Sequence, residues 1–125
     1  MSDDTPPRDE TLPAPTMEIA FHGVDHSDFV ENEIRTRADK LVQMYPRIES
    51  IRVVVKCDHH SKTKGNLYGL HIHLGVPGND LYVDREPQQH QEHEEIEVVV
   101  NDGFQAMTRQ LRDYLQKRRD KERRG

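Results

Sequence analysis

The chain has 125 residues, of which 33% are hydrophobic and 33% charged, enough for one compact domain with a modest core and not for two. No apolar run approaches the roughly 20 residues that a membrane-spanning helix requires, and the acidic, proline-containing start differs from a signal peptide, so we expect a cytoplasmic protein with no membrane partner. The net charge of -5 conceals an asymmetry, because residues 80–102 carry eight acidic and one basic side chain, whereas residues 103–125 carry eight basic and three acidic.

The first predicted elements follow an N-terminal tail. Residues 1–16 contain four prolines among acids and threonines, so they cannot bury apolar surface and we expect a flexible tail. Alternating apolar residues predict a short strand over residues 17–21. Apolar residues at helical spacing then predict a helix that Ser27 or Asp28 caps and that ends before Pro46.

Three strands are predicted in the middle of the chain. β-branched residues indicate a well-covered strand over residues 48–57. A basic, turn-rich loop joins it to a second strand over residues 67–76, so the two are expected to pair as antiparallel neighbours. The Pro-Gly-Asn-Asp sequence at 77–80 predicts a turn before a short strand over residues 81–83. The hydrophilic stretch 86–95 is expected to be an exposed loop.

The last element carries the strongest pattern. Apolar residues recur every three or four positions and predict one long helix from residue 94 to about residue 118. Ile96, Val98 and Val100 also alternate as in a strand, and the following Asn101-Asp102-Gly103 is a turn signal, so a hairpin is the alternative. We prefer the helix because the helical phase continues unbroken beyond this triplet.

The polar side of this helix is strongly basic. Arg109, Arg112, Arg119 and Arg123 recur at helical spacing, as expected of a surface that binds a polyanion. The alternative is a solvated helix end, because basic residues near a C-terminus also interact favourably with the helix dipole.

The histidines and the cysteine offer weaker signals. His71 and His73 share one face of a strand, and His90 and His93 lie in the acidic loop. The sequence identifies no carboxylate that must complete a ligand set with them, so we expect no metal. The single Cys57 cannot form an internal disulfide, which fits a reducing compartment. Without an oriented nucleophile or a glycine-rich phosphate loop, we expect no enzyme, no cofactor and no small-molecule substrate.

Taken in order, the elements predict an α+β domain with the order β-α-β-β-β-α. It would have two layers, a largely antiparallel four-stranded sheet with both helices packed on one face.

Two stretches carry a resemblance to a known family. One is Lys40-Leu41-x-x-Met44-Tyr45-x-Arg47-Ile48 followed by Val53-Val54-Val55-Lys56, and the other is Met107-Thr108-Arg109-Gln110-Leu111. With the order of elements, they resemble the ribosome hibernation-promoting factors and ribosome-associated translation inhibitors over residues 17–121, leaving a basic end at residues 122–125. The chain departs from the family's usual Asp-Lys-Leu sequence at Gln105-Ala106-Met107 and from a common aromatic at Glu97.

The resemblance implies a non-enzymatic protein with a fold similar to double-stranded-RNA-binding domains. It would bind the small ribosomal subunit and its ribosomal RNA in the mRNA and tRNA channel, and inhibit translation or promote ribosome hibernation under stress, as a short-form member without a second domain. Position in the family suggests Lys40, Arg109, Lys117 and Arg119 as RNA-binding residues. The basic face of the last helix adds Arg112, and the basic loop adds Lys62 and Lys64. The alternative is an accessory protein- or metal-binding domain that kept the fold and lost ribosome binding.

Overall fold

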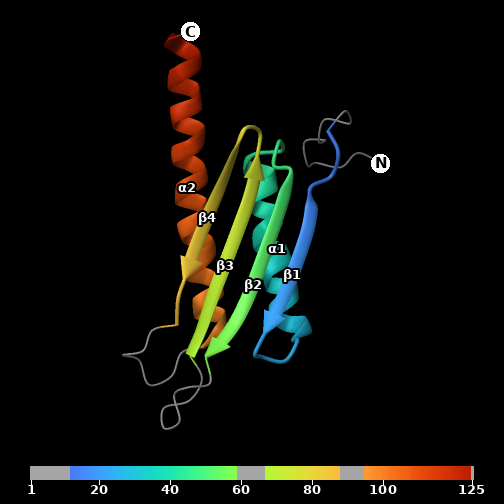
Figure 1. Ribbon diagram of the computed structural model, residues 1–125. Coiled ribbons are helices and arrows are strands. Elements are labelled where there is room, and N and C mark those ends of the chain that lie inside the picture. Colours follow the sequence, from blue (N-terminus) through green and yellow to red (C-terminus); the bar gives the residue numbers. More distant parts are fainter. Residues whose placement is uncertain (1–11, 59–66, 88–94, 125) are drawn as a thin grey trace.

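The computed structural model describes residues 12–58, 67–87 and 95–124. Its elements follow the predicted β-α-β-β-β-α order, which confirms the α+β fold (Figure 1). They are β1 Thr16–His22, α1 Asp28–Met44, β2 Ser50–Asp58, β3 Leu67–Val76, β4 Asn79–Arg85 and α2 Ile96–Arg124. Within these ranges, neither helix has the length and apolar character needed to cross a membrane.

The four strands form one mixed sheet in the order β1-β2-β3-β4. β1 runs parallel to β2 because the whole of α1 crosses between them, whereas β2–β3 and β3–β4 are antiparallel. β4 is longer than the predicted residues 81–83. Gly78 adopts a φ of 75° in the turn before it, and this tight reversal lets pairing start at once with Val76 opposite Asn79.

Both helices pack on the same face of the sheet. Figure 1 views the sheet from its other face, which no described element covers. The core lies between the helices and the sheet, and the apolar stripe predicted for α2 is part of it, with Phe104 3% exposed and Met107 and Leu111 fully buried. The largest fully buried side chains are Ile34, Ile48, Leu70, Ile72, Leu74, Met107, Leu111, Val53, Val55, Val99 and Val100.

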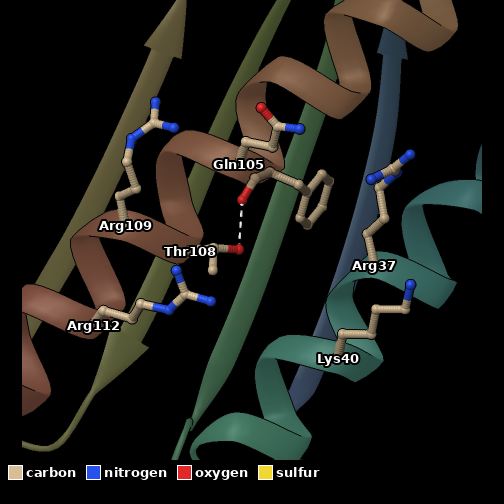
Figure 2. Close-up of a pocket in the computed structure, with 7 residues that line it drawn as sticks. Arg37, Lys40, Gln105, Thr108, Arg109 and Arg112 are labelled. Carbon is tan, nitrogen blue, oxygen red and sulfur yellow. Dashed lines mark hydrogen bonds between the residues drawn. The ribbon is translucent and has the colours of Figure 1, made fainter.

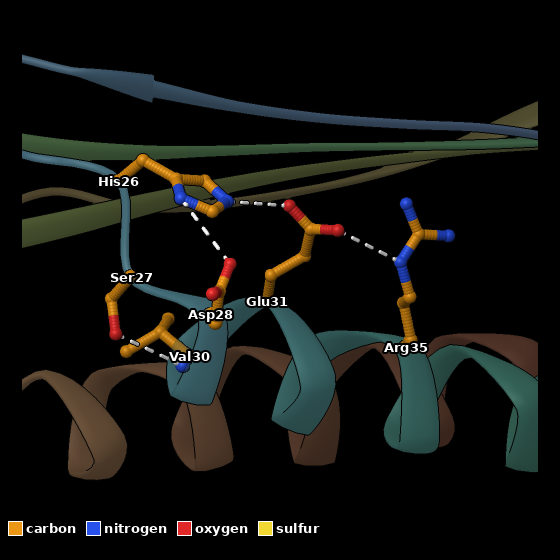
Figure 3. A network of polar contacts seen from close by, with 6 residues as sticks. All are labelled: His26, Ser27, Asp28, Val30, Glu31 and Arg35. Carbon is orange, nitrogen blue, oxygen red and sulfur yellow. Dashed lines mark hydrogen bonds and ion pairs between the residues drawn. The ribbon is translucent and has the colours of Figure 1, made fainter.

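A polar network fixes the start of α1 (Figure 3). Ser27 is the N-cap, and its Oγ accepts a hydrogen bond from the Val30 backbone N–H at 3.3 Å. His26 Nε2 lies 2.8 Å from Glu31 Oε1, while Arg35 Nε donates to Glu31 Oε2 at 3.1 Å. Two hydrogen bonds lower the pKa of Glu31: the one with His26 has the larger effect, and the one from Arg35 has the next largest.

The last element is one continuous helix, so the hairpin alternative is wrong. α2 continues past the expected end near residue 118. Contacts between side chains four residues apart support this extension. Gln116 Nε2 donates to Asp120 Oδ1 at 3.1 Å, and Arg118 Nε lies 3.7 Å from Glu122 Oε1.

Several sequence-based expectations fall outside the described residues. They concern most of the N-terminal tail, the basic loop with Lys62 and Lys64, and the greater part of the acidic loop with His90 and His93.

Candidate nucleic-acid interface

Three of the predicted RNA-binding residues meet at a groove between the helices. The groove has a volume of about 380 Å³. Figure 2 shows α1 on one side of it and α2 on the other. The lining residues are Arg37 and Lys40 from α1, and Phe104, Gln105, Thr108, Arg109 and Arg112 from α2.

The groove follows from where each helix buries its apolar stripe. On α1, Arg37 and Lys40 each come directly before a buried residue, Ala38 and Leu41. On α2, Thr108 and Arg112 each come directly after one, Met107 and Leu111. Successive helical residues are about 100° apart around the axis. The polar residues therefore lie at the edges of the two buried stripes, and the edges of neighbouring helices face each other.

Three of the cations at this groove lack partners among the described residues. Lys40, Arg109 and Arg112 are exposed, and none forms an ion pair or a hydrogen bond with a described residue. An unpaired cation keeps its full attraction for an external anion, so this surface is suited to a phosphate-rich partner.

Arg37 adds a fourth cation that the sequence analysis did not select. Its Nε is buried without a hydrogen bond, and Glu33 Oε2 lies 3.7 Å away. That distance qualifies as an ion pair but is too long for a hydrogen bond, so the guanidinium is only partly neutralised. Its position three residues before Lys40, on the same side of α1, is the signal that could have identified it.

Thr108 and Gln105, which both line the groove, differ in whether their hydrogen-bond donors are available to a ligand. The Thr108 hydroxyl already donates to the Phe104 carbonyl at 2.8 Å (Figure 2). The Gln105 side chain is exposed, and its amide can donate to an anion. Gln105 therefore adds an uncharged hydrogen-bond donor to this groove.

A second hollow lies farther along α2, towards its C-terminal end. It has a volume of about 400 Å³ and includes the predicted Arg119 together with Arg118 and Glu122. The Tyr114 hydroxyl donates to the Pro77 carbonyl at 3.2 Å, and Arg118 donates to the same hydroxyl at 3.0 Å. This hydrogen bond raises the pKa of Arg118. Because Glu122 also lines the hollow, its charge is more mixed than that of the groove.

The aromatic side of this hollow is well packed. Burial, followed by the proximity of Tyr114, raises the pKa of Tyr45, so Tyr45 stays protonated at neutral pH. The two tyrosine rings meet edge to face, with centroids 6.1 Å apart. The predicted Lys117 is exposed on the same part of α2.

Two acidic residues of the 80–102 segment, Asp80 and Asp84, lie away from the groove. Asp80 and Asp84 project from β4 onto the uncovered sheet face, where they contact His73 at 3.1 Å and His71 at 2.6 Å. The sequence analysis had found no carboxylate for these histidines. Even so, no group of three or more metal-ligating side chains gathers in the part of the chain that the structure describes, and the absence of a bound metal stays a prediction.

Comparison with known families decides the identity. The family model described as sigma 54 modulation protein / S30EA ribosomal protein matches residues 17–119. The chain belongs to this family. The predicted resemblance is thereby confirmed, and S30EA family proteins are non-enzymatic, ribosome-associated modulators of translation and hibernation.

Solved structures agree with the S30EA assignment at the level of the fold. A ribosomal subunit interface protein from Coxiella burnetii is 13% identical, with a TM-score of 0.63 over 79% of this chain and 96% of that one. The N-terminal domain of Thermus thermophilus Protein Y is 9% identical, with a TM-score of 0.58 over 80% of this chain and 98% of that one. No curated protein sequence matches at a significant level.

Proposed function

We propose that this chain is a ribosome-associated regulator that binds the small ribosomal subunit in the mRNA and tRNA channel. It would contact ribosomal RNA through the helical face, and so inhibit translation or promote hibernation under stress in the cytoplasm. The observation that carries the proposal is the groove at which Lys40, Arg109 and Arg112 meet without a partner among the described residues. Phosphate contacts supply most of the sequence-independent affinity for nucleic acid.

The basic surface has a length suited to a nucleic-acid backbone. Arg109 and Arg119 are ten residues apart on one helix, which corresponds to roughly 15 Å at about 1.5 Å per residue. Phosphates along one strand of a duplex are spaced by about 3.4 Å along the axis. The helix can therefore follow several phosphates, with Lys117 extending the contact. Lys62 and Lys64 are proposed as additional contacts from the loop.

Negative charge on the uncovered face of the sheet should restrict RNA to the helical face. Asp80 and Asp84 lie on the opposite face of the sheet, where they would repel a phosphate backbone. RNA is therefore expected on the helical face alone. Acidic residues more than a Debye length of about 8 Å from the groove are largely screened at physiological salt, so they do not cancel its attraction.

Co-sedimentation with purified small subunits at low salt tests the proposal. The wild type should pellet, whereas the variant Arg109→Glu/Arg112→Glu/Arg119→Glu should stay in the supernatant although it remains folded. Two double variants with the same change in net charge distinguish loss of the binding site from loss of positive charge. Arg109→Glu/Arg112→Glu should abolish pelleting, whereas Arg52→Glu/Lys56→Glu on the other face should not.

Two results would contradict the proposal. If the wild type does not pellet, or if it pellets equally well with and without the three arginines, the helical face has no RNA-binding role. The chain would then be an accessory domain that kept the fold and lost ribosome binding.

A further inference from the structure

The uncovered face of the sheet carries an exposed aromatic side chain on a rigid support. Tyr82 of β4 is 52% exposed. Its ring stacks on His73 of β3, with centroids 4.7 Å apart and planes 8° from parallel. His71, two residues from His73 on the same strand, lies 6.1 Å from the Tyr82 ring centroid with a tilt of 41°. Because both strands belong to the paired sheet, the ring is held in place before any partner arrives.

Two carboxylates flank this ring. Asp80 and Asp84 are two residues before and after Tyr82, so all three project to the same face. Their side chains are 55% and 56% exposed, and each contacts an imidazole at one of its oxygens, His73 and His71 respectively. The remaining acceptor capacity of both carboxylates is open to a ligand.

The cations of this face are already engaged by other acids. Arg52 Nε lies 2.8 Å from Glu18 Oε1, and Lys56 Nζ lies 3.3 Å from Glu86 Oε1. With histidine counted as neutral, the described residues of this face bear four carboxylates against two cations. The two layers of the molecule thus present charges of opposite sign.

We propose that this face docks an extended, arginine-rich protein segment, with a guanidinium stacked on Tyr82 and neighbouring arginines paired with Asp80 and Asp84. Guanidinium groups stack on aromatic rings and pair with carboxylates through two hydrogen bonds, which an ammonium group cannot do. A nucleic-acid strand could also stack on Tyr82, but its phosphates would meet the two carboxylates. Charge complementarity therefore favours a basic protein segment.

The strand geometry matches such a segment. Alternate residues of a β-strand lie about 7 Å apart, which is also the spacing of alternate side chains in an extended peptide. Asp80, Tyr82 and Asp84 would thus meet every second residue of a segment lying along β4. Gln110 Nε2 of α2 donates to the Tyr82 carbonyl at 2.6 Å, which occupies the outer edge of β4 at that point. The segment therefore lies on the face and does not extend the sheet.

This site is independent of the proposed RNA surface, because the groove and Tyr82 belong to opposite faces of the molecule. Both could be occupied at once. Loss of one activity by substitution should leave the other intact, so the two proposals can fail separately.

Fluorescence anisotropy with a labelled peptide of alternating arginine and serine tests the proposal, with the lysine-serine peptide as the matched ligand. The wild type should bind the arginine peptide about 2–5-fold more tightly than the lysine peptide. Tyr82→Ala and Asp84→Asn should each weaken it about 2–5-fold. Tyr82→Phe keeps the ring and should retain binding, and Arg112→Gln on the helical face should leave it unchanged.

Four outcomes would overturn the proposal. The first is that the arginine peptide does not bind. The second is that both peptides bind equally well and Tyr82→Ala does not change this binding. The third is that a single-stranded RNA binds and Tyr82→Ala abolishes its binding. The fourth is a dimer in sedimentation experiments that Tyr82→Ala dissolves, because a second copy would then cover this face. If Tyr82→Ala does not fold, Asp84→Asn and the difference between the arginine and lysine peptides still test the proposal: equal binding of both peptides that Asp84→Asn does not change would overturn it.

Discussion

Gly103 of α2 lies directly against the side chain of Leu70 on β3. A Cβ atom at residue 103 would overlap Leu70 Cδ2 and would lie 3.5 Å from Ile72 Cδ1. The glycine is therefore required for close approach of the helix to the sheet. Position 103 requires glycine because glycine lacks a side chain. It does not depend on the backbone flexibility that makes Asn-Asp-Gly a turn signal.

Replacing Gly103 by alanine should destabilise the domain by about 1–3 kcal/mol. Alanine is favoured over glycine in a helix by roughly 1 kcal/mol, but the overlap with Leu70 outweighs this gain because the core has little room to adjust. Urea unfolding measures the change. Gln105→Ala, exposed on the same helix, should shift stability by less than about 0.5 kcal/mol. A stabilised Gly103→Ala variant would show that α2 lies farther from the sheet.

Truncation of the buried stripe of α2 should be costly. Met107→Ala should lower the free energy of unfolding by about 2–5 kcal/mol and Phe104→Ala by about 3–5 kcal/mol, because each leaves a cavity between the helix and the sheet. Chemical denaturation followed by circular dichroism gives the values. Losses below about 0.5 kcal/mol at both positions would place the stripe outside the core.

The network at the start of α1 should make stability depend on pH. The pKa of Glu31 is lower in the folded protein, so its contribution is fully present above the ordinary glutamate value of about 4.3. That contribution is lost as pH falls through the lowered pKa. The stability difference between wild type and Glu31→Gln should therefore shrink on acidification below about pH 4. A difference that stays constant down to about pH 2 would argue against the network.

Ribosome binding should respond to salt in proportion to the number of phosphate contacts. Lys40→Gln should reduce the slope of log affinity against log salt by about one unit, because it removes one contact. Lys56→Gln is the control, since Lys56 is paired with Glu86 on the other face. Equal slopes for wild type and Lys40→Gln would remove Lys40 from the interface.

The acidic face should not influence this binding. Asp80→Asn/Asp84→Asn should pellet with small subunits as the wild type does, because both carboxylates project away from the helical groove. Tighter pelleting of this variant would mean that their charge reaches the RNA surface.

The elements could be predicted from the sequence wherever a local pattern reflects burial. The stripe through Phe104 and Met107 identified α2, and its continuity correctly outweighed the turn signal at Gly103. β4 was predicted too short because Asp80 and Asp84 do not resemble strand residues. Their partners, His73 and His71, become neighbours only through pairing of β3 with β4.

The groove was only partly predictable for a similar reason. Charge and position suggested Lys40, Arg109 and Arg112, but their meeting depends on how α1 and α2 pack on the sheet. Arg37 was overlooked among acidic neighbours, and the burial of its Nε atom becomes apparent only in the structure. The contact between Arg118 and Tyr114 likewise depends on the approach of Tyr114 to Pro77, which no local pattern specifies.

The last turns of α2 extend past the end of the sheet (Figure 1), and Leu111 is the last buried residue of the helix. The turns of α2 after Leu115 thus carry positive charge without contributing a buried side chain to the core. Substitutions after Leu115 can raise or lower the positive charge with little effect on the core. Over evolutionary time, such a helix lets affinity for a partner drift while thermodynamic stability is conserved, so related chains can differ widely in binding strength on one unchanged scaffold.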